Sequence, residues 1–248
     1  MIIQKSQAEL SLMGEAGRIT ARALRLVGEH VRPGVTTGEL DSVAEQAIRE
    51  EGAVPAFLGY HGFPASICAS LNSQVVHGIP GKTRLREGDI ISIDIGAVHE
   101  GYYGDSARTF AVGEVSELAK ALMDATERSL FAGIALCEPG RHLYDISSAV
   151  QTVAEGAGFS VVREYVGHGI GQAMHEEPNV PNYGPAGKGP LLKEGMVFAI
   201  EPMVNAGGAA VESLDDGWTV VTQDGSLSAH FEHTVAITPS GPLVLTVE

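Results

Sequence analysis

The amino-acid sequence predicts an α+β protein built from two similar halves. Apolar residues recur near the helical period over residues 6–30 and 116–136, and a Pro-Gly pair follows each stretch. Second helical stretches run over residues 36–51 and 143–154, and strand-like segments follow them. Because the Pro-Gly pairs, at positions 33 and 139, lie 106 residues apart, we expect an internal duplication with a site between the halves.

Local signals support the individual elements. Thr36 and Glu39 have the spacing of a capping box, and Gly52 is placed to end that helix. Apolar runs rich in β-branched and aromatic residues predict strands at residues 90–98, 102–112, 160–165, 196–204, 218–222 and 231–238. The glycine-rich residues 184–189 predict a surface loop. Since no linker divides the chain, residues 1–248 are expected to form a single domain.

Charge and cysteine content exclude several classes of protein. The chain carries 31 acidic and 16 basic side chains, a formal net charge of −15, and such a surface repels nucleic acid and anionic membranes. Cys68 and Cys137 are too few for a disulfide framework or a thiolate cluster, which favours the cytoplasm. The N-terminal residues lack a secretory signal, and no apolar run is long enough to span a membrane.

The segment IISIDIGAVHEGYYGDSARTF predicts a β-hairpin with a two-residue turn at His99-Glu100. In that register Asp94 lies directly opposite Asp105 on the same face. Two facing carboxylates repel each other unless a proton or a cation lies between them. An ordinary solvated hairpin face and a proton-sharing dyad are the alternatives, although the Asp-Thr/Ser-Gly pattern of such dyads is absent.

Two further acids lie in apolar surroundings. Glu201 is in GMVFAIEPMV and Glu232 is in HFEHTVAI, and both segments resemble buried strands. A buried carboxylate without a partner costs several kcal/mol. A salt bridge is the ordinary solution, but few basic residues are near either segment. Four strand carboxylates therefore favour a site for divalent cations.

Histidines accompany these acids. His168 and His175 are in VGHGIGQAMHEEP, whose glycines predict a loop that brings backbone close to a ligand. His77, in NSQVVHGIP, is expected where a strand ends at a turn, and His61 is ambiguous. Each histidine taken alone has a structural or solvent-exposed alternative. The sequence has no HExxH, GxSxG or P-loop pattern and no dinucleotide-binding βαβ unit, so the residues themselves predict a carboxylate-rich two-metal hydrolase.

Five motifs carry a resemblance to a known family. NSQVVHGIP, DIGAVHEGYYGDSARTF, GHGIGQAMHEEP, EPMVN and FEHTVAIT stand in the order and spacing of the type I methionine aminopeptidases of peptidase family M24. The chain resembles the short bacterial form, because it lacks the zinc-binding extension and the type II insertion. The resemblance implies a pita-bread fold, in which two pseudo-symmetric halves hold a curved antiparallel sheet inside helices, and one catalytic domain over residues 1–248.

The resemblance also implies a metal site. The matching ligands are Asp94 for one ion, His168 and Glu201 for the other, and Asp105 and Glu232 as bridges. Carboxylates and one imidazole without thiolate suit Co, Mn, Fe or Zn. The implied reaction removes the initiator methionine from nascent proteins and peptides, with preference for a small second residue, by attack of an activated hydroxide on the first peptide bond.

Other positions match substrate and cation sites of the family. His77 and His175 match the substrate-binding histidines, and Glu201 matches the proton shuttle. The methionine pocket is expected to be apolar and to consist of Phe57, Tyr60, Phe63, Cys68, Met174 and Trp218. Met174 stands where Phe is usual and Phe63 where Tyr is common. A monovalent-cation site for Na or K is matched by Asn72, Ser73 and Ser228.

The resemblance further implies a monomer that meets nascent chains through transient contact with the ribosome. Two rival functions have the same fold. A prolidase or aminopeptidase P cleaves Xaa-Pro bonds and usually carries an extra N-terminal domain. A non-catalytic pita-bread protein that binds peptides generally lacks metal ligands, whereas all five are present here.

Overall fold

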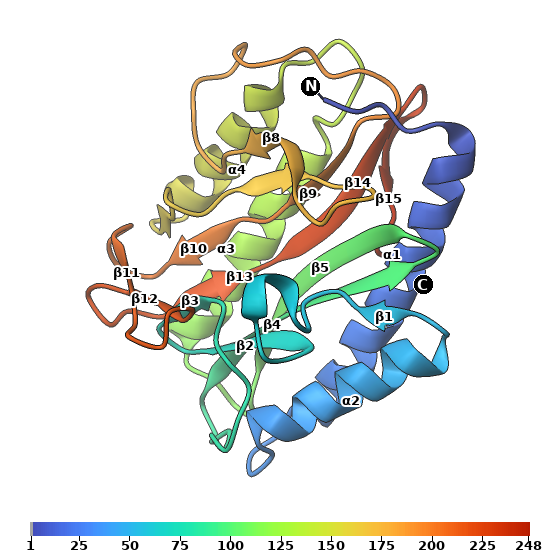
Figure 1. Ribbon diagram of the computed structural model, residues 1–248. Helices are drawn as coiled ribbons and strands as arrows, with labels where there is room; N and C mark the ends of the chain where they lie inside the picture. The colour runs from blue at the N-terminus through green and yellow to red at the C-terminus, as the bar shows by residue number, and fades with distance from the viewer. Residues whose placement is uncertain (1) are drawn as a thin grey trace.

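The computed structural model describes residues 2–248, and its elements follow the expected α+β order (Figure 1). The helices are α1 (Gln7–His30), α2 (Thr37–Glu50), the 3-10 helix η1 (Tyr60–Gly62), α3 (Glu117–Ile134) and α4 (Leu143–Gly156). The strands are β1 (Val54–Pro55), β2 (Ile67–Leu71), β3 (Gln74–Val76), β4 (Ile90–His99), β5 (Tyr102–Ala111), β6 (Ser160–Val161), β7 (Gly167–Gly169), β8 (Glu176–Val180), β9 (Val197–Ile200), β10 (Met203–Asn205), β11 (Val211–Ser213), β12 (Val220–Thr222), β13 (Ser228–His230), β14 (Glu232–Thr238) and β15 (Gly241–Val244). Among residues 2–248, no helix combines the length and apolar content that a membrane crossing needs.

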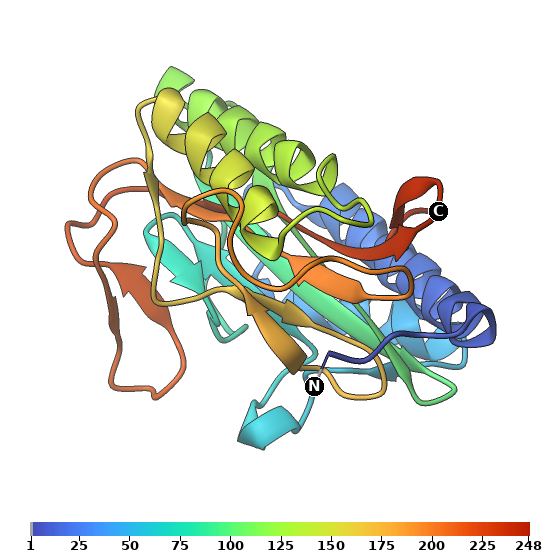
Figure 2. The ribbon, with the colours of Figure 1, turned by 90° about the horizontal axis from the view of Figure 1, so that it is seen from above.

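Antiparallel pairs build the central sheet. Its strands run in the order β1-β4-β5-β14-β9-β7-β8, with β2 beside β4 and β15 beside β14. Two smaller sheets, β13-β10-β6 and β11-β12-β3, extend it. In Figure 2 helices α3 and α4 lie on one side of the strands, and η1 lies on the opposite side.

Each helix pair covers a core of its own. Helices α1 and α2 pack with Ile91, Ile93 and Ile95 of β4, and α3 and α4 pack with Phe198 of β9 and Val235 of β14. These apolar side chains are buried, and their transfer from water is the main stabilising contribution to each half. The predicted arrangement of two α+β halves is therefore confirmed.

The helix ends match their sequence signals. Ser6 and Thr36 both form complete capping boxes, with Glu9 and Glu39 as the partners at the third helical position. Gly52 adopts a φ of 74°, the left-handed conformation expected after α2. Local hydrogen bonding by the side chains thus sets where both N-terminal helices begin.

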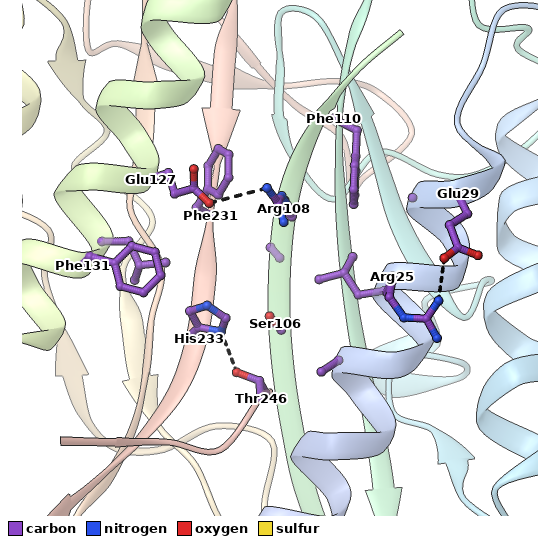
Figure 3. Close-up of a pocket in the computed structure, with 15 residues that line it drawn as sticks. Arg25, Glu29, Ser106, Arg108, Phe110, Glu127, Phe131, Phe231, His233 and Thr246 are labelled. Atoms are coloured by element: carbon purple, nitrogen blue, oxygen red, sulfur yellow. Dashed lines mark hydrogen bonds and ion pairs between the residues drawn. The ribbon is translucent and has the colours of Figure 1, made fainter. Parts of the chain in front are cut away.

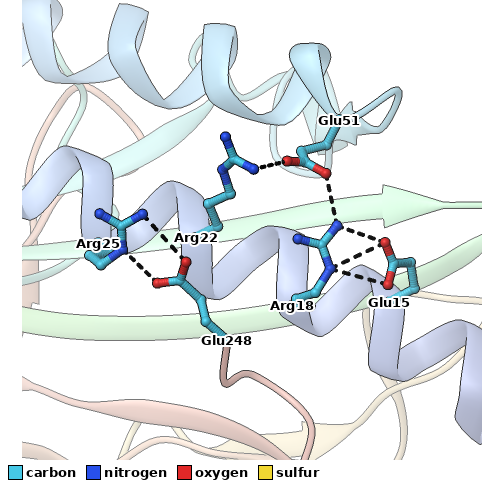
Figure 4. Close-up of polar contacts among 6 residues, drawn as sticks. All are labelled: Glu15, Arg18, Arg22, Arg25, Glu51 and Glu248. Carbon is cyan, nitrogen blue, oxygen red and sulfur yellow. Dashed lines mark hydrogen bonds and ion pairs between the residues drawn. The ribbon is translucent and has the colours of Figure 1, made fainter.

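Ion pairs join α1 to the end of α2 and to the C-terminus (Figure 4). Arg18 donates to Glu51 at 2.8 Å, Arg22 pairs with the same carboxylate, and Arg25 donates to Glu248 at 2.6 Å. Because these side chains are partly exposed, each pair is worth at most about 1 kcal/mol. Their contribution to the stability of the fold is therefore small.

The turn between β4 and β5 differs from the prediction. His99 pairs with Tyr102, so the turn residues are Glu100 and Gly101, and the predicted His99-Glu100 turn is wrong. Both turn residues have positive φ, 47° and 83°. A type I′ turn needs this conformation at both central positions, and glycine adopts it without a steric penalty. Glu-Gly therefore fits the turn better than His-Glu.

The shifted turn changes the register of the hairpin. Asp94 pairs with Ala107, and Asp105 pairs with Gly96, so the two aspartates are diagonal rather than directly opposite. The shift moves the pairing by two residues, and side chains alternate with a period of two. Asp94 and Asp105 therefore still point to the same face of the sheet.

Other strand predictions were too long. Residues 196–204 form two strands, β9 and β10, because the chain breaks at Glu201-Pro202, where proline has no N–H to donate to a ladder. Residues 160–165 contribute only β6, and residues 218–222 contribute only β12. Short strands such as β1, β7 and β13 were not predicted, since they are too brief to show a period.

Candidate metal centre

The sheet order collects the five residues expected to bind metal. Asp94 lies on β4, Asp105 on β5, Glu232 on β14, Glu201 directly after β9, and His168 on β7. These strands are consecutive neighbours in the sheet. All five side chains line one cavity of about 270 Å³. Residues that are far apart in the sequence thus reach one place, in the cleft between the two halves.

Ala107 occupies the centre of the row of acids. It pairs with Asp94 on one side and with Glu232 on the other, and Asp105 follows on the same face of β5. The methyl side chain of Ala107 leaves space between the carboxylates. Three acids therefore converge from three adjacent strands.

The backbone of Asp105 is fixed by close packing of helix α1 and by hydrogen bonds to Thr234. A Cβ atom on the preceding Gly104 would lie 2.7 Å from the backbone of Ala16, so only glycine allows α1 to approach β5 this closely. The hydroxyl of Thr234 accepts from the Asp105 N–H at 3.1 Å and donates to its carbonyl at 2.8 Å. The main chain is thereby satisfied, and the carboxylate remains available for the cavity.

His168 lies within the short strand β7, and the predicted loop between strands runs over residues 170–175, as far as His175. The glycines that flank His168 serve strand packing. A Cβ atom on Gly167 would collide with the carbonyl of Ala199, and one on Gly169 would collide with the carbonyl of Glu177. Glycine on both sides of the histidine lets the backbones of β8 and β9 approach closely.

The imidazole of His168 has a defined orientation. Nδ1 lies 2.9 Å from the Gly169 carbonyl, which can only accept, so Nδ1 carries the proton. Nε2 then presents a lone pair to the cavity, 3.7 Å from Oδ2 of Asp105 and 3.5 Å from Oε1 of Glu201. This is the tautomer in which Nε2 can ligate a cation.

The acids of the cavity have raised pKa values. Burial raises the pKa of Asp94 to about 7 and that of Glu201 to about 8. Burial, followed by repulsion from neighbouring acids, holds the pKa values of Asp105 and Glu232 well above their usual range. Burial also lowers the pKa of His168 to about 4. The cluster therefore needs protons or cations to offset its charge.

The donor atoms fit divalent metal ions. Oδ1 of Asp94, Oδ1 of Asp105 and Oε1 of Glu232 are buried and have no hydrogen-bond partner within residues 2–248. Donor atoms of Asp105, His168 and Glu232 all lie within 4.8 Å of one another. The cavity lining, taken over the described residues, contains no lysine or arginine. Unpaired carboxylate oxygens beside one imidazole match the ligand preference of first-row divalent metals.

Both histidines expected to contact substrate line the same cavity. His77 follows β3, as expected, and has a φ of 60°, an uncommon conformation outside glycine. Its pKa is lowered to about 4, mainly by burial. His175 lies just before β8, and its ring centroid is 4.2 Å from that of His168. The hydroxyl of Tyr60 lies 2.7 Å from Nδ1 of His175.

The six residues expected in the methionine pocket also line this cavity: Phe57, Tyr60, Phe63, Cys68, Met174 and Trp218. Phe63 and Trp218 meet edge to face with ring centroids 5.1 Å apart. Cys68 pairs with Asp94 across β2 and β4, which joins the apolar wall to the acids. His61, which the sequence left ambiguous, lines the cavity as well. An apolar pocket therefore adjoins the acidic cluster.

The residues matched to a monovalent cation lie near one another outside that lining. The Ser228 N–H donates to the Asn72 carbonyl at 2.9 Å, and the carbonyl of the adjacent Ser73 accepts from Thr222 at the same distance. Their role as a cation site stays a prediction.

A second cavity, of about 390 Å³, lies on the other face of β5 and β14, between α1 and α3 (Figure 3). Since side chains alternate along a strand, Ser106 and His233 face this cavity whereas their neighbours Asp105 and Glu232 face the first. Arg108 pairs with Glu127 at 3.6 Å on its rim. The smaller cavity, where the unpaired acids converge, is the candidate active site.

Sequence reasoning missed one residue beside the acids. His230, on β13, is 1% exposed, and its Nε2 lies 3.6 Å from Oε2 of Glu201. Its segment, SAHFEHT, contains two histidines around Glu232, and the spacing alone does not say which one faces the site. Alternation along the chain was the usable signal, because His230 and Glu232 are two residues apart.

Comparisons with known proteins agree with this geometry. The model of Metallopeptidase family M24 matches residues 11–239. The chain is 56% identical over 246 residues to Methionine aminopeptidase 1 of Bacillus subtilis (strain 168), and the match covers 99% of each. The crystal structure of methionine aminopeptidase from Thermotoga maritima is 45% identical and has a TM-score of 0.99 over 100% of both chains. The prolidase from Pyrococcus horikoshii OT3 is 26% identical with a TM-score of 0.80, and only 65% of it is covered.

These similarities confirm the predicted pita-bread fold, because the full-length superposition includes both halves. They also separate the rival families, since the prolidase is matched over part of its length while the methionine aminopeptidases are matched from end to end. The chain therefore belongs to metallopeptidase family M24 and, within it, to the methionine aminopeptidases.

Proposed function

We propose that this protein removes the N-terminal methionine from proteins and peptides, preferring a small second residue, by hydrolysis of the first peptide bond. The observation that carries the proposal is the convergence of four acids, of which Asp105 and Glu232 are buried, and His168 beside an apolar pocket. Relatives that match the chain along their whole length and are named methionine aminopeptidases support the choice of substrate.

Two divalent ions would be held by the five residues of the cluster. Asp94 would bind one ion, His168 and Glu201 the other, and Asp105 and Glu232 would bridge them. The unpaired oxygens of Asp94, Asp105 and Glu232 support this assignment. When bound, such ions supply a water of lowered pKa and positive charge beside the scissile carbonyl. The donor set is compatible with Mn, Fe, Co or Zn.

Side chains around the cluster would handle the substrate and its protons. Glu201, which lines the cavity beside the proposed ions, would take a proton from water and pass it to the leaving amine. His175 would donate to the scissile carbonyl, and His77 would contact the peptide beyond it. A donor aimed at the developing oxyanion lowers the barrier to attack.

The methionine side chain would lie against the apolar wall of the cavity. Phe63 and Trp218 form one rigid part of this wall through their edge-to-face contact. Met174 is 3% exposed and is the most adaptable residue of the wall, because its side chain is unbranched and flexible. Phe57, Tyr60 and Cys68 complete the proposed pocket.

A peptide assay tests this function. Purified protein with Mn²⁺ or Co²⁺ is expected to release methionine from Met-Gly-Met and to leave Xaa-Pro peptides intact. Cleavage of Xaa-Pro peptides alone would instead indicate a prolidase, and no release with any divalent metal would exclude the enzyme.

Asp105→Asn tests the bridging role. The variant is expected to lose bound metal, measured by mass spectrometry of the elements, and to lose methionine release. Asp124→Asn is the matched control, because this side chain is 65% exposed on α3 and does not line the cavity. Full metal content and turnover in Asp105→Asn would refute the ligand assignment.

Finer aspects of the function are proposed from the substrate. A nascent-chain substrate supports a cytoplasmic monomer that contacts ribosomes transiently, and sedimentation with and without ribosomes tests both. A stable dimer, or the absence of a ribosome-bound fraction, would contradict this.

A monovalent-cation site at Asn72, Ser73 and Ser228 is proposed as well. If Na or K binds there, activity should depend on the monovalent salt. Equal rates in tetramethylammonium chloride would contradict the proposed cation site.

A further inference from the structure

His230 is a buried histidine whose ring forms no hydrogen bond within residues 2–248. Nδ1 and Nε2 both lack a hydrogen-bond partner in the part of the chain that the structure describes. The side chain is 1% exposed, so bulk water does not reach it. Because burying an unpaired imidazole costs free energy, packing alone is a poor explanation for histidine at this position.

The acidic group nearest to His230 is Glu201, and each of its two carboxylate oxygens lies near a different histidine. Oε1 of Glu201 lies 3.5 Å from Nε2 of His168, and Oε2 lies 3.6 Å from Nε2 of His230. One oxygen therefore lies beside the proposed ligand His168, and the other lies beside His230. A carboxylate that binds metal through one oxygen is commonly oriented by a donor on the other.

The backbone of His230 is fixed with respect to both β5 and β10. Its N–H donates to the Thr109 hydroxyl at 2.9 Å, and that hydroxyl lies 3.0 Å from the His230 carbonyl. Met203, two residues after Glu201, pairs with His230 between β10 and β13. The ring is therefore presented to Glu201 by a strand that cannot slide without breaking these contacts.

We propose that His230 is a positioning residue that donates its Nε2–H to Oε2 of Glu201 and so directs Oε1 toward the cation held with His168. The inference rests on the metal site proposed above. The present separation of 3.6 Å exceeds a normal N–H···O bond and closes with a side-chain movement of roughly half an ångström. Asp94 and His77 are the other titratable groups that act on this ring.

Two substitutions separate hydrogen bonding from packing. His230→Gln keeps an N–H donor, and His230→Leu keeps apolar volume but removes the donor. The measurements are Mn²⁺ affinity by calorimetry, the visible spectrum of the Co²⁺-loaded protein, kcat and KM for Met-Gly-Met, and thermal unfolding by circular dichroism. His230→Phe, which keeps a ring, takes the place of the leucine variant if that variant does not unfold cooperatively.

The leucine variant is expected to bind Mn²⁺ about 10- to 100-fold more weakly and to lose kcat with little change in KM. The glutamine variant is expected to stay close to wild type in both. Wild-type affinity and kcat in the leucine variant would overturn the proposal and leave only packing. Equal losses in both variants, with an altered Co²⁺ spectrum, would also overturn it, because His230 would then be a ligand. If the wild-type protein bound no metal, the proposed function itself would fail.

Discussion

The hydroxyl group of Tyr60 lies 2.7 Å from Nδ1 of His175. Tyr60 was expected only as part of the apolar pocket, so its polar contact is an addition to that prediction. Burial raises the pKa of the phenol and lowers that of the imidazole, so the phenol keeps its proton and the ring is neutral. A phenol that donates to Nδ1 leaves the imidazole proton on Nε2, the nitrogen available to a substrate carbonyl.

Tyr60→Phe is therefore expected to lower kcat about 3- to 10-fold, the effect of one net hydrogen bond, with little change in KM. Methionine release from Met-Gly-Met measures both constants. Tyr144→Phe, on α4, is the matched control and should behave as wild type. An unchanged kcat in Tyr60→Phe would mean that the hydroxyl does not orient His175.

A buried ion pair anchors the segment that carries Met174 and His175. Lys5 pairs with Oε2 of Glu176 at 2.5 Å, and these side chains are 3% and 10% exposed. The other oxygen of Glu176 accepts from the Gln172 backbone N–H at 3.0 Å. The N-terminal segment thus fixes the turn between β7 and β8 from outside the cavity.

Lys5→Met is expected to destabilise the protein by about 3–5 kcal/mol, because it leaves a buried carboxylate without its counter-charge. It should also raise KM, since the turn beneath the substrate loosens. Urea unfolding and peptide kinetics check the two effects. Lys120→Met removes an exposed pair with Glu117 and should cost about 0.5 kcal/mol or less. Equal stability of the two variants would show that the Lys5 pair is not structural.

The hairpin shows why part of the site could be predicted from sequence. Asp94 and Asp105 share a face in both the expected and the observed register, because an even shift preserves alternation. Their exact pairing depended on the turn. The expected register put the turn at His99-Glu100 and left Gly101 in the strand, whereas Gly101 is the second turn residue. Face assignment is therefore robust to an error that alters the distance between the two carboxylates.

The unpredicted parts depend on contacts between distant segments. Lys5 and Glu176 are 171 residues apart, and Tyr60 and His175 are 115 residues apart. Neither pair has a local sequence signal, since only the assembled sheet brings them together. The glycines around His168 predicted the loop over residues 170–175 but not the short strand β7 before it. That strand depends on close packing of Gly167 and Gly169 against β9 and β8, which has no local signal.

The raised pKa values of the acids make the stability of the metal-free protein depend on pH. The ordinary pKa values of Asp94 and Glu201 are 3.8 and 4.5, and their pKa values in the folded protein are about 7 and 8. At a pH between the ordinary and the folded value, each group holds a proton that the unfolded chain has released. Stability therefore falls as pH rises through this window. Burial lowers the pKa of His168 from 6.5 to about 4. This group has the opposite effect, but only below pH 6.5, because its contribution to stability rises with pH between about 4 and 6.5.

Urea unfolding of the EDTA-treated protein is accordingly expected to show lower stability at pH 8.5 than at pH 6.5. The change should shrink in a variant with Glu201→Gln, which has no proton to lose. Exposed Glu117→Gln, with its side chain 90% exposed, is the control and should keep the full pH dependence. Stability that rises over this interval would mean that the acids are already ionised in the folded protein.

Binding of Mn²⁺ should release protons, because ligating carboxylates must be ionised and the metal-free acids hold protons near neutral pH. Calorimetry at pH 7 in two buffers of different ionisation enthalpy measures the number of protons released. Affinity should increase between pH 6.5 and pH 8, as Asp94 and Glu201 lose the protons that compete with the cation. Glu201→Gln should release fewer protons as well as bind more weakly. A binding enthalpy that is the same in both buffers would show that the cluster is ionised before metal arrives, and the paired acids would then have to be stabilised by a group other than a proton.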